Sequence, residues 1–345
     1  MTVAEDLGVR QSAVLAALVQ EYISTGEPVG SRTISKKYQL GVSPATIRNT
    51  MSDLEDMGLL QQPHTSAGRA PTDQGIRIFI DYLMEIRSLS DPERFRIEQR
   101  YGDIALGNDL LSQVVRVLSE LTQHPAVVRS PRADGLVMKQ LRFMPVEPGR
   151  VLAVLVTSFG VTQSRLLEVT IDLNETRLER IHNYLNELIP GRTLSEAKQA
   201  ILREKQESRR TMDQMMADAL TLGRGALDEL DEEPDLRVHG QAKLLQRTAQ
   251  LDVEKLRHLM ELLDDQAQLA ELLDATMNAP GPLVMIGGEH PVTESAECSV
   301  IAATYSISGD SRGTLAVVGP RSMDYTKVVP VVGFTAHILS GPDQD

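Results

Sequence analysis

Four basic side chains lie within a short stretch of the sequence that holds no acidic residue. Arg32, Lys36, Lys37 and Arg48 fall between residues 29 and 52 and give this stretch a local charge of +4. The whole chain carries a net charge of −13, so it repels polyanions in general. A basic stretch inside an acidic protein therefore predicts one confined contact with nucleic-acid phosphates.

The clearest helix signals surround the last of these basic residues. Ser43 is a typical N-cap, and Gly58 can end the helix in a left-handed conformation. Between them, Ile47, Met51 and Leu54 recur at helical spacing, which predicts one buried stripe.

The opposite face of this helix carries side chains that can read DNA bases. Arginine pairs bidentately with guanine, asparagine pairs with adenine, and small side chains contact the thymine methyl group. We expect the second helix of a helix-turn-helix, whose N-terminal part enters the major groove. The alternative is an ordinary capped surface helix. The candidate DNA-binding residues here are Ser43, Ala45, Thr46, Arg48, Asn49 and Ser52.

Two helices are predicted before this one. Apolar residues recur at helical spacing from residue 10 to residue 25, and Gly26 ends the run. A shorter helix follows in the segment SRTISKKYQ, with Ser31 as its predicted N-cap and Ile34 facing the core. Three basic side chains are then expected to face outward and contact phosphates: Arg32, Lys36 and Lys37.

A wing-shaped hairpin is predicted after the third helix. Leu59 and Leu60 begin a short strand, the segment HTSAGRAP supplies the tip, and Pro71 closes the return. We place Arg69 on the tip, where it can enter a minor groove or hold a phosphate. A further helix, TDQGIRIFIDYLM, is expected to pack back on this domain. Three polar side chains of the tip can donate hydrogen bonds to phosphates: His64, Thr65 and Ser66.

The remainder of the chain combines strand patterns with helix patterns. Residues 136–172 and the later segments PLVMIG, CSVIAATYSI and TLAVVG predict strands, and we expect the two groups to form one sheet. Between them, residues 193–276 have helical periodicity and are interpreted as an insertion. Leu256, Leu259 and Leu263 fit either packing inside one subunit or a coiled-coil-like contact between two subunits.

Sequence signatures of catalysis and metal binding are absent. The only cysteine, Cys298, lies in an apolar strand that favours a small buried side chain, and the seven histidines are dispersed. Neither a nucleophile elbow nor a zinc-binding H-E-x-x-H segment occurs. Gly287 and Gly288, beside Glu289 and His290, favour a tight turn over a phosphate-binding loop. We therefore expect no enzyme activity, no catalytic residue, no cofactor and no metal.

Two sequence features indicate the cellular compartment of the protein: its N-terminus and its most apolar stretch. The N-terminus lacks the basic and apolar regions of a signal peptide. The apolar residues 151–161 are fewer than the roughly 20 that a membrane-spanning helix needs. We expect a cytoplasmic protein that does not enter the membrane.

Several of these segments resemble the HrcA family of bacterial heat-inducible transcription repressors. The N-terminal ones are GSRTISKKY, SPATIRNTMSDLEDMGLLQQPHTSAGRAPT and GIRIFIDYL, and the C-terminal ones are IGGEHP and YSISGDSRGTLAVVGPRSMDY. The resemblance implies a homodimer that binds an inverted-repeat operator called CIRCE and represses chaperone operons until heat relieves repression. It also implies a partner, a GroEL-type chaperonin, that keeps the repressor active.

The residue patterns and the resemblance together predict an α+β multidomain protein. A winged helix-turn-helix is expected in residues 1–88. The resemblance implies that residues 100–192 and 277–345 form a GAF-like mixed α/β domain and that the mainly helical insertion, residues 193–276, is a dimerisation domain. A two-fold dimer on double-stranded DNA predicts a palindromic operator. Two alternatives stay open: a regulator switched by a small ligand in the GAF-like domain, and a winged helix that binds protein.

Overall fold

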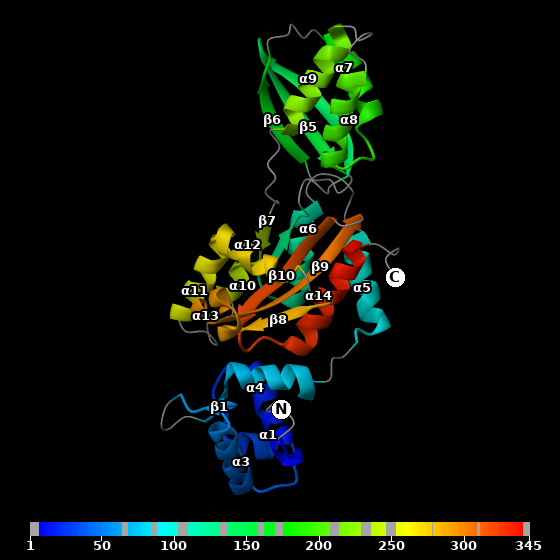
Figure 1. Cartoon of the computed structure of the whole chain (residues 1–345). Helices are drawn as coiled ribbons and strands as arrows, with labels where there is room; N and C mark the ends of the chain where they lie inside the picture. The colour runs from blue at the N-terminus through cyan, green and yellow to red at the C-terminus, as the bar shows by residue number, and fades with distance from the viewer. Residues whose placement is uncertain are drawn as a thin grey trace.

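A computed structural model describes residues 7–63, 68–84, 88–102, 110–131, 137–157, 162–169, 175–207, 214–228, 236–245, 253–277, 279–308 and 311–340. Figure 1 shows three bodies in a row, with an N-terminal helical body at one end and a small sheet with three helices at the other. A larger sheet, with helices on both faces, lies between them (Figure 1). Among the described helices, none is both long enough and apolar enough to cross a membrane.

The N-terminal body is a winged helix-turn-helix, as predicted. Its strands β1 and β2 pair antiparallel, and a bridge between Val29 and Arg69 extends this small sheet. Its core holds the expected stripes of the helices, including Val14, Ile47 and Leu54, each fully buried. The elements in order are α1 (Val9–Thr25), α2 (Ser31–Lys37), α3 (Pro44–Asp56), β1 (Leu60–Gln61), β2 (Ala70–Pro71), α4 (Asp73–Ile78) and the π-helical η1 (Phe79–Leu83).

The central body is built on a five-stranded sheet in the order β7-β3-β10-β9-β8, with every neighbouring pair antiparallel. Strand side chains alternate between its two faces, so that Val300 and Ile301 enter different cores. The strands are β3 (Ala126–Arg129), β7 (Leu236–His239), β8 (Leu283–Ile286), β9 (Cys298–Ser308) and β10 (Ser311–Pro320).

Helices cover both faces of this central sheet. One face packs against α5, α6 and α14, and its core is continuous with that of the winged helix. The other face packs against α11, α12 and α13 (Figure 1). The helices are α5 (Asp91–Gly102), α6 (Leu110–Thr122), α10 (Ala242–Leu245), α11 (Val253–Asp264), α12 (Gln266–Asp274), the 3-10 turn η3 (Gly287–Glu289), α13 (Pro291–Ser295) and α14 (Tyr325–Ser340).

The third body has a separate sheet and a separate core. Its strands pair in the order β4-β5-β6, and three helices cover one face of them. The chain leaves the central sheet after β3 and re-enters it at β7, where Arg129 and Leu236 are register partners. The elements are β4 (Met138–Glu147), β5 (Arg150–Thr157), β6 (Thr162–Glu168), α7 (Glu175–Leu188), α8 (Leu194–Glu207) and α9 (Gln214–Asp228).

Two expectations about the part of the chain after the winged helix differ from the structure. The prediction that the strands of residues 136–172 share a sheet with the C-terminal strands is wrong, because β4, β5 and β6 pair only with one another among the described strands. The segment 193–276 does not have one core of its own. Its helices α8 and α9 pack on β4–β6, whereas α11 and α12 pack on the central sheet. Helical periodicity marks each helix but does not reveal which sheet the helix covers.

The leucines of α11 and α12 therefore lie in the core of the central body. Leu259, Leu263, Leu269 and Leu273 are each at most 2% exposed and lie in one core with β9 and β10. Packing inside one subunit explains their spacing without a coiled coil.

Candidate nucleic-acid interface

Helix α3 exposes the face that the sequence assigned to base reading. Ala45, Arg48, Asn49 and Ser52 are exposed, and Thr46 is half-buried. The opposite stripe is buried in the core of the winged helix. Figure 1 shows α3 on the side of the winged helix that points away from the central body, so neither of the other two bodies, as far as the structure describes them, covers α3.

The start of α3 is fixed by its cap. Ser43 Oγ accepts a hydrogen bond from the backbone N–H of Thr46 at 3.1 Å and lies 2.9 Å from Thr46 Oγ1. This satisfies one of the free N–H groups at the helix N-terminus. Ser43 and Thr46 thus hold the end of α3 that carries Ala45 and Arg48.

Helix α2 starts differently from the prediction. Gly30, not Ser31, is its N-cap, and no side chain caps the helix. Arg32 and Lys36 are exposed on α2, as expected. Neither they nor Arg48 form an ion pair within the part of the chain that the structure describes. Their charge is therefore available to a polyanion.

Lys37 has a partner that the prediction did not include. Its Nζ lies 2.6 Å from Glu21 Oε1, and the Glu21 side chain is only 6% exposed. The hydroxyl of Tyr38 donates to the other carboxylate oxygen at 3.4 Å, and burial, together with this nearby carboxylate, raises the pKa of Tyr38. Glu21 stands on the apolar face of α1, one helical turn after Ala17, which is the sequence signal that could have revealed this pair.

Arg69 lies at the base of the wing, so its predicted place on the tip is wrong. Its backbone pairs with Val29 in both directions, with N–O distances of 2.7 and 2.9 Å. Its guanidinium forms an ion pair with Glu55 of α3, with Nη2 2.7 Å and Nε 2.8 Å from Oε2. Arg69 therefore joins the wing to helix α3. The predicted wing residues His64, Thr65 and Ser66 lie outside the described residues.

Gly287 and Gly288 lie in a turn, and Cys298 lies in the core. Gly287 and Gly288 form the 3-10 turn η3, which faces α4 of the winged helix. Cys298 is fully buried, and burial raises its thiol pKa to about 12. No group of three or more metal-ligating side chains comes together among the residues that the structure describes.

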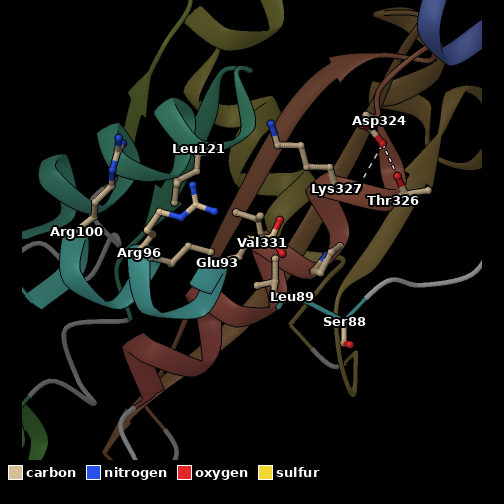
Figure 2. Close-up of a pocket in the computed structure, with 12 residues that line it drawn as sticks. Ser88, Leu89, Glu93, Arg96, Arg100, Leu121, Asp324, Thr326, Lys327 and Val331 are labelled. Carbon is tan, nitrogen blue, oxygen red and sulfur yellow. Dashed lines mark hydrogen bonds between the residues drawn. The ribbon is translucent and has the colours of Figure 1, made fainter. Parts of the chain in front are cut away.

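A cavity of about 480 Å³ lies where the chain leaves the winged helix and enters the central body. Figure 2 shows Arg96 of α5 and Lys327 of α14 beside it, with Leu121 and Val331 among its apolar lining. Asp324 also lines this cavity, and one of its carboxylate oxygens is hydrogen-bonded locally. Its Oδ1 accepts hydrogen bonds from Thr326 Oγ1 at 2.6 Å and from the backbone N–H of Lys327 at 3.3 Å.

Comparison with known proteins covers nearly the whole chain. Residues 6–80 match the family model "Winged helix-turn-helix transcription repressor, HrcA DNA-binding", and residues 108–329 match "HrcA protein C terminal domain". A heat-inducible transcription repressor HrcA of Sorangium cellulosum is 42% identical over 338 residues, 97% of each chain. The HrcA repressor of Geobacter sulfurreducens is 36% identical over 338 residues, 97% of this chain and 98% of its own. A crystal structure described as a hypothetical protein is similar with a TM-score of 0.65 at 28% identity, covering 97% of this chain and 98% of that one.

Proposed function

The chain belongs to the HrcA family of heat-inducible transcription repressors, and we propose that it represses chaperone operons by binding an inverted-repeat operator as a homodimer. The observation that carries this proposal is the open face of α3. It combines Arg48 and Asn49, which suit base edges, with small neighbouring side chains that allow close approach to the major groove.

The described residues support distinct roles in DNA contact. In the proposal, Ala45, Arg48, Asn49 and Ser52 meet the bases, while Arg32 and Lys36 neutralise phosphates beside the groove. Ser43 and Thr46 hold the N-terminal turn of α3, which enters the groove first. We assign Lys37 and Arg69 to the internal geometry of the domain because their charges are paired with Glu21 and Glu55. His64, Thr65 and Ser66 remain predicted phosphate contacts.

The outer face of the β4-β5-β6 sheet supports the proposed dimer. Helices cover the other face, but Met144 and Leu166 are 47% and 44% exposed on this one. They flank the half-buried Leu152 in one row, because Met144 pairs with Leu152 and Leu152 pairs with Leu166 in the register. An exposed apolar row across three strands favours a partner surface of the same kind.

These observations also suggest different domain boundaries after the winged helix from the ones that the sequence suggested. We propose that residues 137–228 are the inserted dimerisation domain, since they share one core and contain the apolar row. Residues 110–131 and 236–340 then form the GAF-like domain around the central sheet. Family membership supports two further parts of the proposal: activation by a GroEL-type chaperonin, and action in the cytoplasm with release on heat stress.

Fluorescence anisotropy tests the proposal. The purified chain would be titrated against a labelled inverted repeat from a chaperone promoter, a single half-site and a scrambled duplex, at several salt concentrations and with or without chaperonin. We expect selective binding to the inverted repeat whose affinity falls with salt as counterions are released. Equal binding to the repeat and the scrambled duplex, with and without chaperonin, would reject the repressor proposal.

The cavity beside α5 and α14 favours a second candidate function, regulation by a small organic anion. Its apolar lining suits a hydrocarbon portion, and Arg96 and Lys327 supply positive charge for a carboxylate. Thermal-shift titrations with benzoate, 2-oxoglutarate and inorganic phosphate would test this function. Stabilisation that Arg96→Met removes, together with weaker operator binding in the presence of the anion, would support it. No stabilisation by any of the three probes would count against it.

A further inference from the structure

Helix α4 of the winged helix is bonded to the η3 turn of the central body. Arg77 Nε donates to Glu289 Oε1 at 2.7 Å, and Arg77 Nη2 donates to Glu289 Oε2. The same Nη2 also donates to the carbonyl of Val284, at 2.6 Å. Glu289 is held in turn by the backbone N–H of Ile286, 2.9 Å from its Oε2. One guanidinium thus binds both the Glu289 side chain and the backbone of strand β8.

A second contact lies one helical turn earlier on α4. Asp73 Oδ2 accepts a hydrogen bond from the backbone N–H of Gly288 at 3.0 Å. Its other oxygen, Oδ1, forms an ion pair with Arg321, whose Nε lies 3.2 Å away. Asp73 and Arg77 therefore bind adjacent parts of one turn, and two contacts along a helix restrict its rotation more than one contact does.

The sequence of the turn fits this close approach. Gly287 has φ +47°, and a Cβ there would collide with the Asp73 carboxylate and lie 2.7 Å from Arg321 Nη2. A larger residue would displace the ends of the Asp73 and Arg321 side chains from this contact, and the positive φ disfavours any residue but glycine. The glycine that sequence reasoning assigned to a tight turn thus also permits the contact between the winged helix and the body.

The contact of Asp73 and Arg77 with Glu289, Gly288 and Arg321, called the joint below, is a defined and partly buried interface. Tyr22 of α1 lies close enough for Lys255 and Arg321 of the body to act on its ionisation, although desolvation dominates and raises its pKa. The Arg77 and Glu289 side chains are 28% and 31% exposed. Partly exposed ion pairs add little stability singly, but a bidentate arginine–carboxylate pair fixes direction. The joint consequently determines orientation more than it contributes to unfolding free energy.

We propose that Asp73, Arg77, Glu289 and Arg321 are positioning residues that set the orientation of the recognition helix on the body. In a dimer, this orientation determines the distance and rotation between the two α3 helices. The joint therefore selects the operator spacing, although none of its residues touches DNA. This inference rests on the proposed function for its DNA consequence, but the orientation itself can be measured without DNA.

The DNA test uses inverted repeats whose half-sites are moved apart in single base-pair steps. A rigid dimer gains a large avidity, roughly 10²- to 10⁴-fold, only when both half-sites are in reach. In Arg77→Met and Glu289→Gln, the winged helix should be less firmly held, which lowers the effective concentration of the second α3 helix at its half-site. We therefore expect each variant to lose about tenfold of the avidity at the native spacing and to tolerate other spacings better than the parent chain does. Binding to a single half-site should be unchanged. Arg257→Met is the matched control, because Arg257 pairs with Glu254 and Glu261 of its own helix.

Spin labels test the orientation without DNA. Labels at Asp56→Cys on α3 and Glu254→Cys on α11 report the distance between the winged helix and the body, and both positions are exposed. We expect a narrow distance distribution in the parent chain and a broadened one in both Arg77→Met and Glu289→Gln. An unchanged distribution in Arg77→Met would overturn the inference. Failure of the parent chain to select any inverted repeat would overturn the proposed function instead.

Discussion

Lys37 Nζ lies 2.6 Å from Glu21 Oε1, and the two residues join helix α2 to helix α1. The adjacent Lys36 is exposed, and no ion pair involving it occurs in the described part of the chain. Two neighbouring lysines of one basic segment therefore serve different purposes. One neutralises a carboxylate that is only 6% exposed, and the other is available to DNA.

This difference predicts that two matched substitutions change the stability of the chain by different amounts. Lys37→Met should lower the free energy of unfolding by about 1–3 kcal/mol, because it leaves the buried Glu21 carboxylate without its charged partner. Lys36→Met should change it by less than about 0.5 kcal/mol. Urea denaturation measures both. The double variant Lys37→Met with Glu21→Leu should recover stability, and a stable Lys37→Met variant would show that the pair is unimportant.

DNA binding should separate the exposed basic residues by type. Arg48→Ala is expected to cost about 1–3 kcal/mol and to relax preference at one operator position, because it removes a base contact. Lys36→Ala should weaken binding to all duplexes alike and reduce the salt slope by about 1, because it removes a phosphate contact. Anisotropy with a set of single-base operator variants distinguishes them. If both variants kept the affinity and selectivity of the parent chain, the docking of α3 and α2 would be incorrect.

The winged helix was predictable because its signals are local. Ser43 caps α3 and Ile47 and Leu54 are buried, as their spacing indicated. The partners of Lys37 and Arg69 were not predicted, because Glu21 and Glu55 lie 16 and 14 residues away in the chain. Periodicity places Glu21 on the buried face of α1, but it does not show which basic side chain lies against Glu21, because that depends on how the helices pack.

The body was harder to predict for the same reason. Strand and helix patterns marked the segments of β5, β9 and α11, but the pairing of strands is a long-range property. Register partners Arg129 and Leu236 are adjacent in the central sheet although a whole body separates them in the chain. An insertion between neighbouring strands leaves no periodic signal at its boundaries. The η3 turn was recognised from its glycines, but its binding to Asp73 was not.

The buried Cys298 predicts a pH dependence of stability. Its thiol pKa rises from an ordinary 9.0 to about 12 through burial, so the folded chain keeps the proton above the pH at which the unfolded chain loses it. Its contribution is fully present below pH 9 and is lost as pH rises towards 12, by at most about 1.4 kcal/mol per pH unit.

A comparison with Cys298→Ala isolates this contribution. The unfolding free energy of the parent chain should fall more steeply between pH 9 and 10 than that of the variant, a range chosen because unfolded tyrosines ionise mainly above pH 10. The folded thiol should also resist a disulfide reagent at pH 8 and react once the chain unfolds. Identical pH profiles, or rapid reaction of the folded chain, would contradict the burial of Cys298.

The apolar row of the β4-β5-β6 sheet predicts how dimerisation and DNA affinity are linked. Leu166 is 44% exposed on β6, at one end of the apolar row, so Leu166→Lys should leave the fold intact while placing a charge in the proposed interface. Glu179→Lys, on an exposed position of α7, is the control for added positive charge. Analytical ultracentrifugation should show monomers for Leu166→Lys and dimers for both the parent chain and the control.

Leu166→Lys should also lose the higher affinity for an inverted repeat that a dimer gains by binding both half-sites. A monomer still presents one α3 helix, so affinity for a single half-site should match that of the parent chain. Affinity for the inverted repeat should fall by roughly 10²- to 10⁴-fold, since the second half-site no longer binds intramolecularly. A Leu166→Lys chain that stayed dimeric would place the dimer interface on another surface. A monomer that kept full affinity for the inverted repeat would show that DNA reading does not require the dimer.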